Sequence, residues 1–122
     1  GLAKFLSKVK YDHFQEKYFW TTFPLSGLNG WPKGKMLSPF YNHNVWSKTG
    51  SLDYINNLAG YIISNSGKTF AFCILINNIK KRNVIDQTGP EQSKILVDQA
   101  PAWKEFTNQK IKLIVQRWIK KY

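Results

Sequence analysis

The sequence has a single cysteine, seven acidic residues and no long apolar run. Cys73 has no partner for an internal disulfide, and its position within the apolar run Phe70–Ile76 favours a small buried hydrophobe over a reactive thiol. No run approaches the about 20 residues that a transmembrane helix needs. The two histidines, His13 and His43, lack a second ligand four residues away and a cysteine pair, so we expect no metal and no other cofactor.

What the chain has in excess is positive charge and aromatic surface. Lys and Arg total 18 against 7 acidic residues, which gives a net charge of +11. Such a balance favours anionic partners, namely nucleic acid, acidic lipid headgroups or an anionic cell-wall polymer. A hydrophobic fraction of 43% and an aromatic fraction of 16% exclude a disordered tail, and 122 residues allow one domain with a real core. The chain does not begin with Met, and Gly1–Leu6 does not resemble a secretion leader, so we expect a fragment or a processed product of a longer protein.

Three runs of β-branched and aromatic residues predict strands, at Val45–Thr49, Leu58–Ile63 and Thr69–Ile76. Asn65–Lys68 joins the last two, and its Ser-Gly step suits a hairpin turn because Gly adopts positive φ at no steric cost. The third run is apolar on both faces, so we expect helices above and below the sheet.

The rest of the chain predicts helices and loops. Residues 2–19 have the apolar spacing of one or two short amphipathic helices, and residues 23–34 form a Gly- and Pro-rich loop. Residues 77–102 are polar, with one short helix over Glu91–Val97. A final helix over Trp103–Lys121 places these apolar residues near one face: Trp103, Phe106, Ile111, Ile114, Val115 and Trp118. The element order predicts an α+β fold.

The segment with the clearest chemistry is Lys48-Thr49-Gly50. On a strand edge, the lysine supplies a point charge and the threonine a hydroxyl donor, while glycine lets a substrate backbone approach closely. Three residues alone are compatible with an ordinary strand end followed by a turn.

The surrounding residues make the pattern more specific. Lys48-Thr49-Gly50-Ser51-Leu52, then Asn57-Leu58-Ala59-Gly60-Tyr61, then a hairpin into a Phe-Ala-Phe strand resembles the third conserved box of serine penicillin-binding proteins. It is most similar to the D-alanyl-D-alanine carboxypeptidase/endopeptidase group of low molecular mass (class C). Upstream, Phe23–Gly30 resembles that family's L-P-x-A/S-G-x-D-G loop. The chain departs from the family at Asn29, where an aspartate is usual, and at Trp46-Ser47, where Arg-Ala is usual.

The resemblance implies roles for four residues. Lys48 would line the active site near the nucleophile, Thr49 would hydrogen-bond the terminal carboxylate of a D-alanyl-D-alanine peptide, and Gly50 would leave room for it. The backbone N–H of Ser51 would form half of the oxyanion hole. The reaction would be acylation of a serine, release of D-alanine and hydrolysis of the acyl-enzyme.

The same resemblance implies that part of the enzyme is missing. The family's S-x-N box is absent, and we do not take Ser7-Lys8-Val9-Lys10, which has the letters of S-x-x-K, as its nucleophile box. Residues 1–122 would then be the C-terminal segment of a transpeptidase-like domain and inactive alone. In the family's five-stranded sheet, Thr69–Ile76 would then have an unpaired edge, which we expect either to dock with the missing part or to pair in a self-dimer. The whole protein would act on peptidoglycan peptides and bind β-lactams in the periplasm of a bacterial cell envelope.

Two alternatives stay open from the sequence. The basic, Trp-bearing end of the last helix, Lys110–Lys121, is compatible with an anionic membrane surface, although packing on the sheet is favoured. The second alternative is a non-enzymatic basic module that binds nucleic acid or lipid. The sequence has no recognised nucleic-acid-binding motif to support it.

Overall fold

A computed structural model describes residues 1–14, 16–25 and 44–122. The elements, in chain order, are α1 (Leu2–Val9), β1 (His13–Phe14), β2 (Lys17–Tyr18), the 3₁₀ helix η1 (Phe19–Thr22), β3 (Val45–Leu52), β4 (Ile55–Ile63), β5 (Thr69–Asn77), α2 (Ile79–Thr88) and α3 (Lys94–Lys121). The predicted α+β class is confirmed. Most of the upstream loop, with Asn29, and also His43 lie outside the described residues.

The three predicted strands form one antiparallel sheet in the order β3-β4-β5. β3 and β5 begin as predicted but continue to Leu52 and Asn77, and β4 begins at Ile55 rather than Leu58, because strand pairing continues past the predicted runs. The predicted hairpin turn between β4 and β5 is also confirmed. It is closed by the Ser64 N–H, which donates to the Lys68 carbonyl at 2.9 Å, and Gly67 takes the positive φ of 82° that the turn requires.

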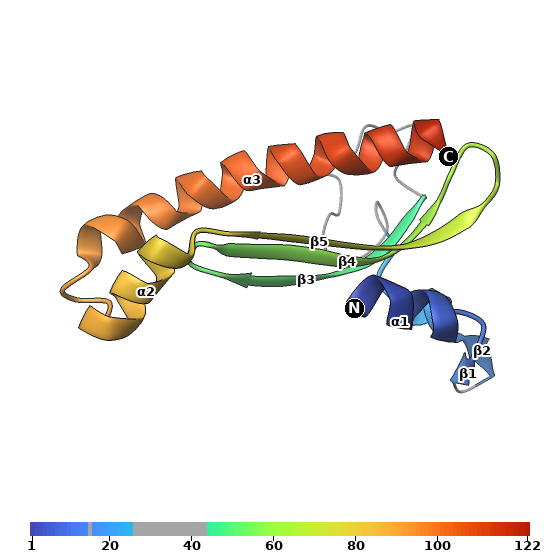
Figure 1. Ribbon diagram of the computed structural model, residues 1–122, viewed down its shortest axis with the longest axis horizontal. Coiled ribbons are helices and arrows are strands. Elements are labelled where there is room, and N and C mark those ends of the chain that lie inside the picture. The colour runs from blue at the N-terminus through green and yellow to red at the C-terminus, as the bar shows by residue number, and fades with distance from the viewer. Residues whose placement is uncertain (15, 26–43) are drawn as a thin grey trace.

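Helix α3 lies along one face of the sheet and buries the main core (Figure 1). The core residues are Val45, Leu58, Ile62, Phe72 and Ile74 from the sheet and Ile111, Val115 and Ile119 from the helix. The expectation that the last helix packs on the sheet is therefore confirmed. Its predicted apolar face was wrong at Phe106, which is 60% exposed, because the contact face passes through Thr107 and Ile111 instead.

The opposite face of the sheet is only partly covered. Helix α1 lies against it near β5 (Figure 1), and the Tyr61 hydroxyl donates to the Leu6 carbonyl at 2.7 Å. Beyond this short helix, Leu75 stays 65% exposed, and Cys73 is half-buried rather than buried as predicted. Both side chains lie on this incompletely covered face, which explains the difference.

Two helix predictions need correction. Of the one or two α-helices predicted within residues 2–19, one forms among the described residues, because the chain after α1 reverses through Glu16, at a φ of 67°, and pairs β1 with β2. Residues 77–102, expected to be mainly loop, form α2 and the start of α3. The short helix predicted at Glu91–Val97 continues as α3 through Pro101, so the terminal helix starts at Lys94 rather than Trp103.

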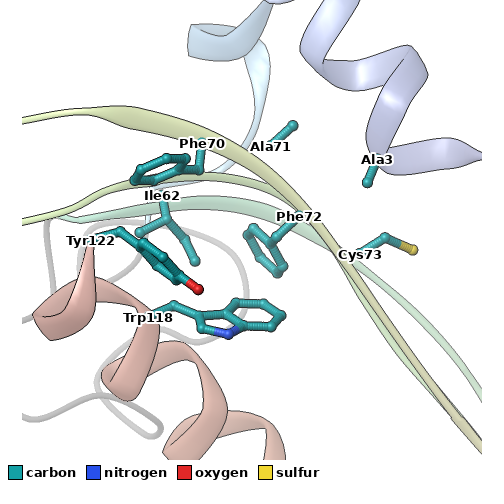
Figure 2. Close-up of a pocket in the computed structure, with 8 residues that line it drawn as sticks. All are labelled: Ala3, Ile62, Phe70, Ala71, Phe72, Cys73, Trp118 and Tyr122. Carbon is teal, nitrogen blue, oxygen red and sulfur yellow. The ribbon is translucent and has the colours of Figure 1, made fainter.

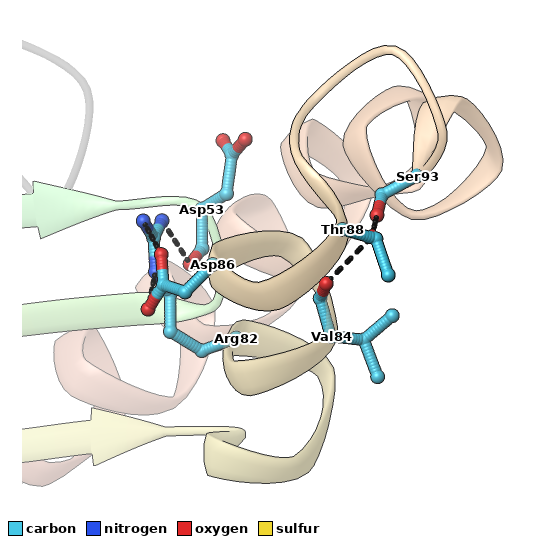
Figure 3. A network of polar contacts seen from close by, with 6 residues as sticks. All are labelled: Asp53, Arg82, Val84, Asp86, Thr88 and Ser93. Carbon is cyan, nitrogen blue, oxygen red and sulfur yellow. Dashed lines mark hydrogen bonds and ion pairs between the residues drawn. The ribbon is translucent and has the colours of Figure 1, made fainter.

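Helix α2 is fixed at the end of the sheet by polar contacts (Figure 3). Arg82 pairs with Asp86 one turn later and donates from Nη1 to the Asp53 carbonyl in the β3–β4 turn at 3.4 Å. Hydrogen bonding to Asp86 raises the pKa of Arg82. Thr88 bonds the Ser93 hydroxyl and so joins the end of α2 to the start of α3. Within the part of the chain described, no helix is long and apolar enough to cross a bilayer.

Candidate functional site

The four residues singled out in the sequence all lie in the second half of β3. Lys48, Gly50 and Ser51 are exposed and Thr49 is half-buried. In the register with β4, Lys48 lies opposite Ala59, Thr49 opposite Leu58 and Gly50 opposite Asn57. Because successive side chains of a strand point to opposite faces, Lys48 projects to the α1 face and Thr49 to the α3 face. What the two residues share is therefore the edge of β3.

The backbone pattern shows which groups of β3 point out of the sheet. The Ile63 N–H donates to the Asn44 carbonyl at 2.8 Å, just before the strand, whereas the Ser47 N–H points away from β4 and donates to the Pro24 carbonyl at 2.9 Å. Hydrogen-bonded and non-hydrogen-bonded pairs alternate along an antiparallel ladder. The N–H and C=O groups of Thr49 and Ser51 therefore point to the same outer edge as those of Ser47.

The start of this edge is covered, and the later part is open to other groups. Leu25 bridges to Trp46, and Pro24 accepts from Ser47. Beyond Ser47, no strand among the described residues pairs with this edge. The Lys48 Nζ folds back and donates to the Thr49 carbonyl at 2.8 Å. An ammonium group and two outward-pointing backbone amides thus lie along one stretch of strand, an arrangement suited to a bound anion.

A groove of about 310 Å³ runs beside the lysine on the α1 face. Its floor is formed by the edge residues Lys48–Gly50 together with Asn57 and Ala59 of β4. Its walls are the apolar side chains of Leu2, Leu6, Phe23 and Leu75. The absence of a side chain on Gly50 keeps the floor low, since a Cβ built there has only the Asn57 Cβ within contact range, at 3.9 Å.

Asn56 ties the far end of the edge to α3. Its Nδ2 donates to Thr107 Oγ1 at 2.9 Å and to Asn108 Oδ1 at 2.7 Å, and its Oδ1 accepts from Ser51 Oγ at 3.4 Å. Asn56 is 1% exposed and fully bonded, so the position of Ser51 is coupled to the long helix.

Neither Asn56 nor the groove walls were singled out in the sequence. Asn56 lies between Ile55 and Asn57, and its two partners on α3 are about fifty residues away, so nothing local marks it. The contact of Leu2 and Leu6 with the groove depends on where α1 lies on the sheet. Their helical spacing predicted the helix but not its neighbour.

The opposite edge of the sheet, along β5, is also open in the described part of the chain. A groove of about 380 Å³ runs along it, between α1 and the end of α3. Figure 2 shows Trp118 of α3 and Tyr122, the residue that follows α3, on the side of Phe70 and Phe72, with Ala3 of α1 on the side of Cys73. By the same alternation, the hydrogen-bonded pairs between β4 and β5 include Leu58 with Ile74 and Gly60 with Phe72. Ala71, Cys73 and Leu75 alternate with these β5 residues, so their backbone N–H and C=O groups point outward. The predicted open edge is therefore present.

Comparison with known proteins gives the family. The model of the D-Ala-D-Ala carboxypeptidase 3 (S13) family matches residues 1–97. The D-alanyl-D-alanine carboxypeptidase DacB of Haemophilus influenzae is 36% identical over 69 residues, which is 55% of this chain. The crystal structure of penicillin binding protein 4 (dacB) from the same organism matches 62% of the chain at 32% identity with a TM-score of 0.50. A second crystal structure, of that protein with a β-lactam, matches 62% of the chain at 33% identity with a TM-score of 0.49.

These relatives are much longer than the chain. It spans 14% of the curated relative and 16% of penicillin binding protein 4. The family match includes all of the sheet and the whole Lys48–Ser51 segment, while most of α3 lies beyond it. The chain belongs to the D-Ala-D-Ala carboxypeptidase 3 (S13) family.

Proposed function

We propose that this chain is the C-terminal segment of a serine D-Ala-D-Ala carboxypeptidase/endopeptidase, in which β3 binds the end of a peptidoglycan stem peptide. The observation that carries the proposal is the open edge of β3, where the Lys48 ammonium lies beside the outward-pointing backbone of Thr49 and Ser51. The S13 membership of the chain supports the same activity.

The edge has the groups that a D-Ala-D-Ala terminus requires. In this proposal the carboxylate of the last residue lies against Lys48 and Thr49, and Gly50 leaves room for the peptide backbone. The Ser51 N–H points outward and acts as one of two donors to the oxyanion that forms on the scissile carbonyl. One such donor contributes about 3 kcal/mol to lowering the barrier in serine hydrolases.

The reaction needs a nucleophile from the rest of the protein, because this sequence has no S-x-N box. Its S-x-x-K sequence, Ser7-Lys8-Val9-Lys10, lies at the C-terminal end of α1 with the Ser7 side chain exposed, so we do not take Ser7 as the nucleophile. A serine Oγ from the rest of the protein attacks the penultimate D-Ala carbonyl carbon as a base takes its proton. The C–N bond then breaks, D-alanine leaves with a proton on its amine, and water hydrolyses the ester. The 122-residue chain alone is therefore inactive, and the active protein works on peptidoglycan in the cell envelope, where it also binds β-lactams.

The open β5 edge completes the proposal. Its outward backbone groups and the apolar groove beside them are suited to receive one more strand. We expect that strand to come from the remaining part of the same polypeptide or from a second copy of this chain. A monodisperse monomer with a stable sheet would contradict this expectation for the isolated chain.

D-alanine release from a peptide ending in D-Ala-D-Ala tests the function in the longer protein that contains this chain. Lys48→Ala should reduce the rate at least about a hundredfold, as expected for the loss of a charged group at a catalytic edge. Lys68→Ala is the matched control, because Lys68 is an exposed lysine in the turn at the other end of the sheet. Equal rates for the two variants would show that the β3 edge has no part in the reaction.

A further inference from the structure

The packing of α3 on the sheet leaves its outer face without a partner in the described part of the chain, although that face has large apolar residues. Ile95 is 74% exposed, Phe106 60% and Leu113 62%. Their spacings of eleven and seven residues are close to three and two whole turns of an α-helix, so the three side chains form one line along the helix. The sheet does not contact this line, because the buried residues of α3 are on the opposite side.

Cations flank the apolar line toward the C-terminus. Exposed Lys110, Arg117 and Lys120 fall within about a quarter turn of it. Lys110 Nζ lies over the Phe106 ring, 4.8 Å from its centroid, so charge and apolar surface are in direct contact. From Lys110 to the end of the chain there are five basic residues and no acidic one: Lys110, Lys112, Arg117, Lys120 and Lys121.

The end of α3 lies close to one more cation. The Asn65 N–H donates to the Ile119 carbonyl at 2.9 Å, and Ser66 Oγ bonds the Tyr122 carbonyl, so the β4–β5 turn is tied to the helix terminus. That turn contains Lys68. The positive charge at this end therefore comes from two segments held together by hydrogen bonds.

We propose that the outer face of α3 docks on the surface of an anionic lipid bilayer, with α3 parallel to the plane of the membrane. Phe106 and Leu113 would enter the region between headgroups and acyl chains, and the flanking lysine and arginine side chains would reach the lipid phosphates. The charge is of the sign that anionic lipid attracts, and the exposed apolar line favours a bilayer over a purely polar polymer such as nucleic acid. The inference does not depend on the proposed catalytic role of β3.

Co-sedimentation with large unilamellar vesicles tests the docking. The longer protein that contains this chain should pellet with vesicles of phosphatidylcholine mixed with phosphatidylglycerol. It should stay in solution with vesicles of phosphatidylcholine alone. Phe106→Ser with Leu113→Ser should weaken binding about tenfold or more, given the value of burying two such side chains. Neutralising each of Lys110, Arg117 and Lys120 with Gln should weaken binding about fivefold at low salt.

The matched control is Ile79→Ser with Val84→Ser, which removes exposed apolar side chains from α2. This pair should bind vesicles as well as the unchanged protein, and circular dichroism should show that all variants are folded. The proposal fails if the control pair weakens binding as much as the α3 pair, or if phosphatidylcholine alone binds equally well. It also fails if the longer protein that contains this chain does not pellet, because the face would then be covered by protein.

Discussion

Gly60 should be the least replaceable glycine of the sheet. A Cβ added there would lie 2.0 Å from the Trp46 carbonyl oxygen and 2.7 Å from the Ser47 Cα, both atoms of the neighbouring strand β3. Ordinary van der Waals contacts are 3.4–4 Å long, so β3 and β4 would have to separate where Trp46 pairs with Tyr61. Overpacking costs about 1–3 kcal/mol, and each weakened ladder hydrogen bond adds about 1 kcal/mol. We therefore expect Gly60→Ala to lower the free energy of unfolding by about 3 kcal/mol.

Urea unfolding followed by circular dichroism measures this loss, and Gly50→Ala is the control. The space at Gly50 is open, with the nearest atom at 3.9 Å, so that substitution should change the free energy of unfolding by less than about 1 kcal/mol. In the longer protein, however, Gly50→Ala should impair peptide turnover, because its methyl group would occupy the edge proposed to receive substrate. A loss below about 1 kcal/mol for Gly60→Ala would refute the close strand approach on which this reasoning depends.

Three further predictions concern buried polar groups. Ser47→Ala should leave stability unchanged or raise it by about 1 kcal/mol in urea unfolding, because Ser47 Oγ is buried without a hydrogen-bond partner in the described structure; a clear loss would mean that the hydroxyl is bonded. Asn56→Ala should cost about 2–3 kcal/mol by the same measurement, since it leaves Thr107 and Asn108 without their partner, and Asn108→Ala, at the half-buried end of the network, should cost less. Burial raises the pKa of Tyr61, with a smaller contribution from Asp12, and burial also raises the pKa of Tyr54. The unfolded chain then loses these protons first, so the stability that they contribute is present below about pH 10 and is lost as pH rises further. The melting temperature should fall between about pH 8 and pH 11, the range in which tyrosines titrate. The double variant Tyr54→Phe with Tyr61→Phe should show a smaller fall. An equal fall in the double variant would exclude these two phenols as its source.

The sequence predicts the sheet well because each strand has its own local pattern. The runs that begin at Val45, Leu58 and Thr69 are short, rich in β-branched and aromatic residues and separated by turn residues, so their positions do not depend on distant contacts. Helix α2 was missed because Ile85 is its one buried residue, and a single apolar position gives no periodicity. The last helix was predicted to begin at Trp103, yet α3 begins at Lys94 and continues through Pro101.

The candidate site also has a part that the sequence predicts and a part that it does not. The segment Lys48–Ser51 can be found from the sequence because its residue types are specific. Which backbone groups face outward could not be predicted, because that depends on the register between β3 and β4. The register is fixed by the two-residue turn at Asp53-Tyr54, where Tyr54 adopts a φ of 63° and is held by its hydrogen bond to the Leu96 carbonyl at 2.6 Å. Such a conformation is rare for a bulky residue, and the contacts that hold it come from α3.

Covalent labelling by a fluorescent penicillin tests the central claim most directly, in the longer protein that contains this chain. Acylation of the unchanged protein should be rapid, Lys48→Ala should slow it at least about a hundredfold, and Lys68→Ala should label normally. Labelling of the Lys48→Ala variant at the rate of the unchanged protein would contradict the assignment of the β3 edge as the substrate-binding strand.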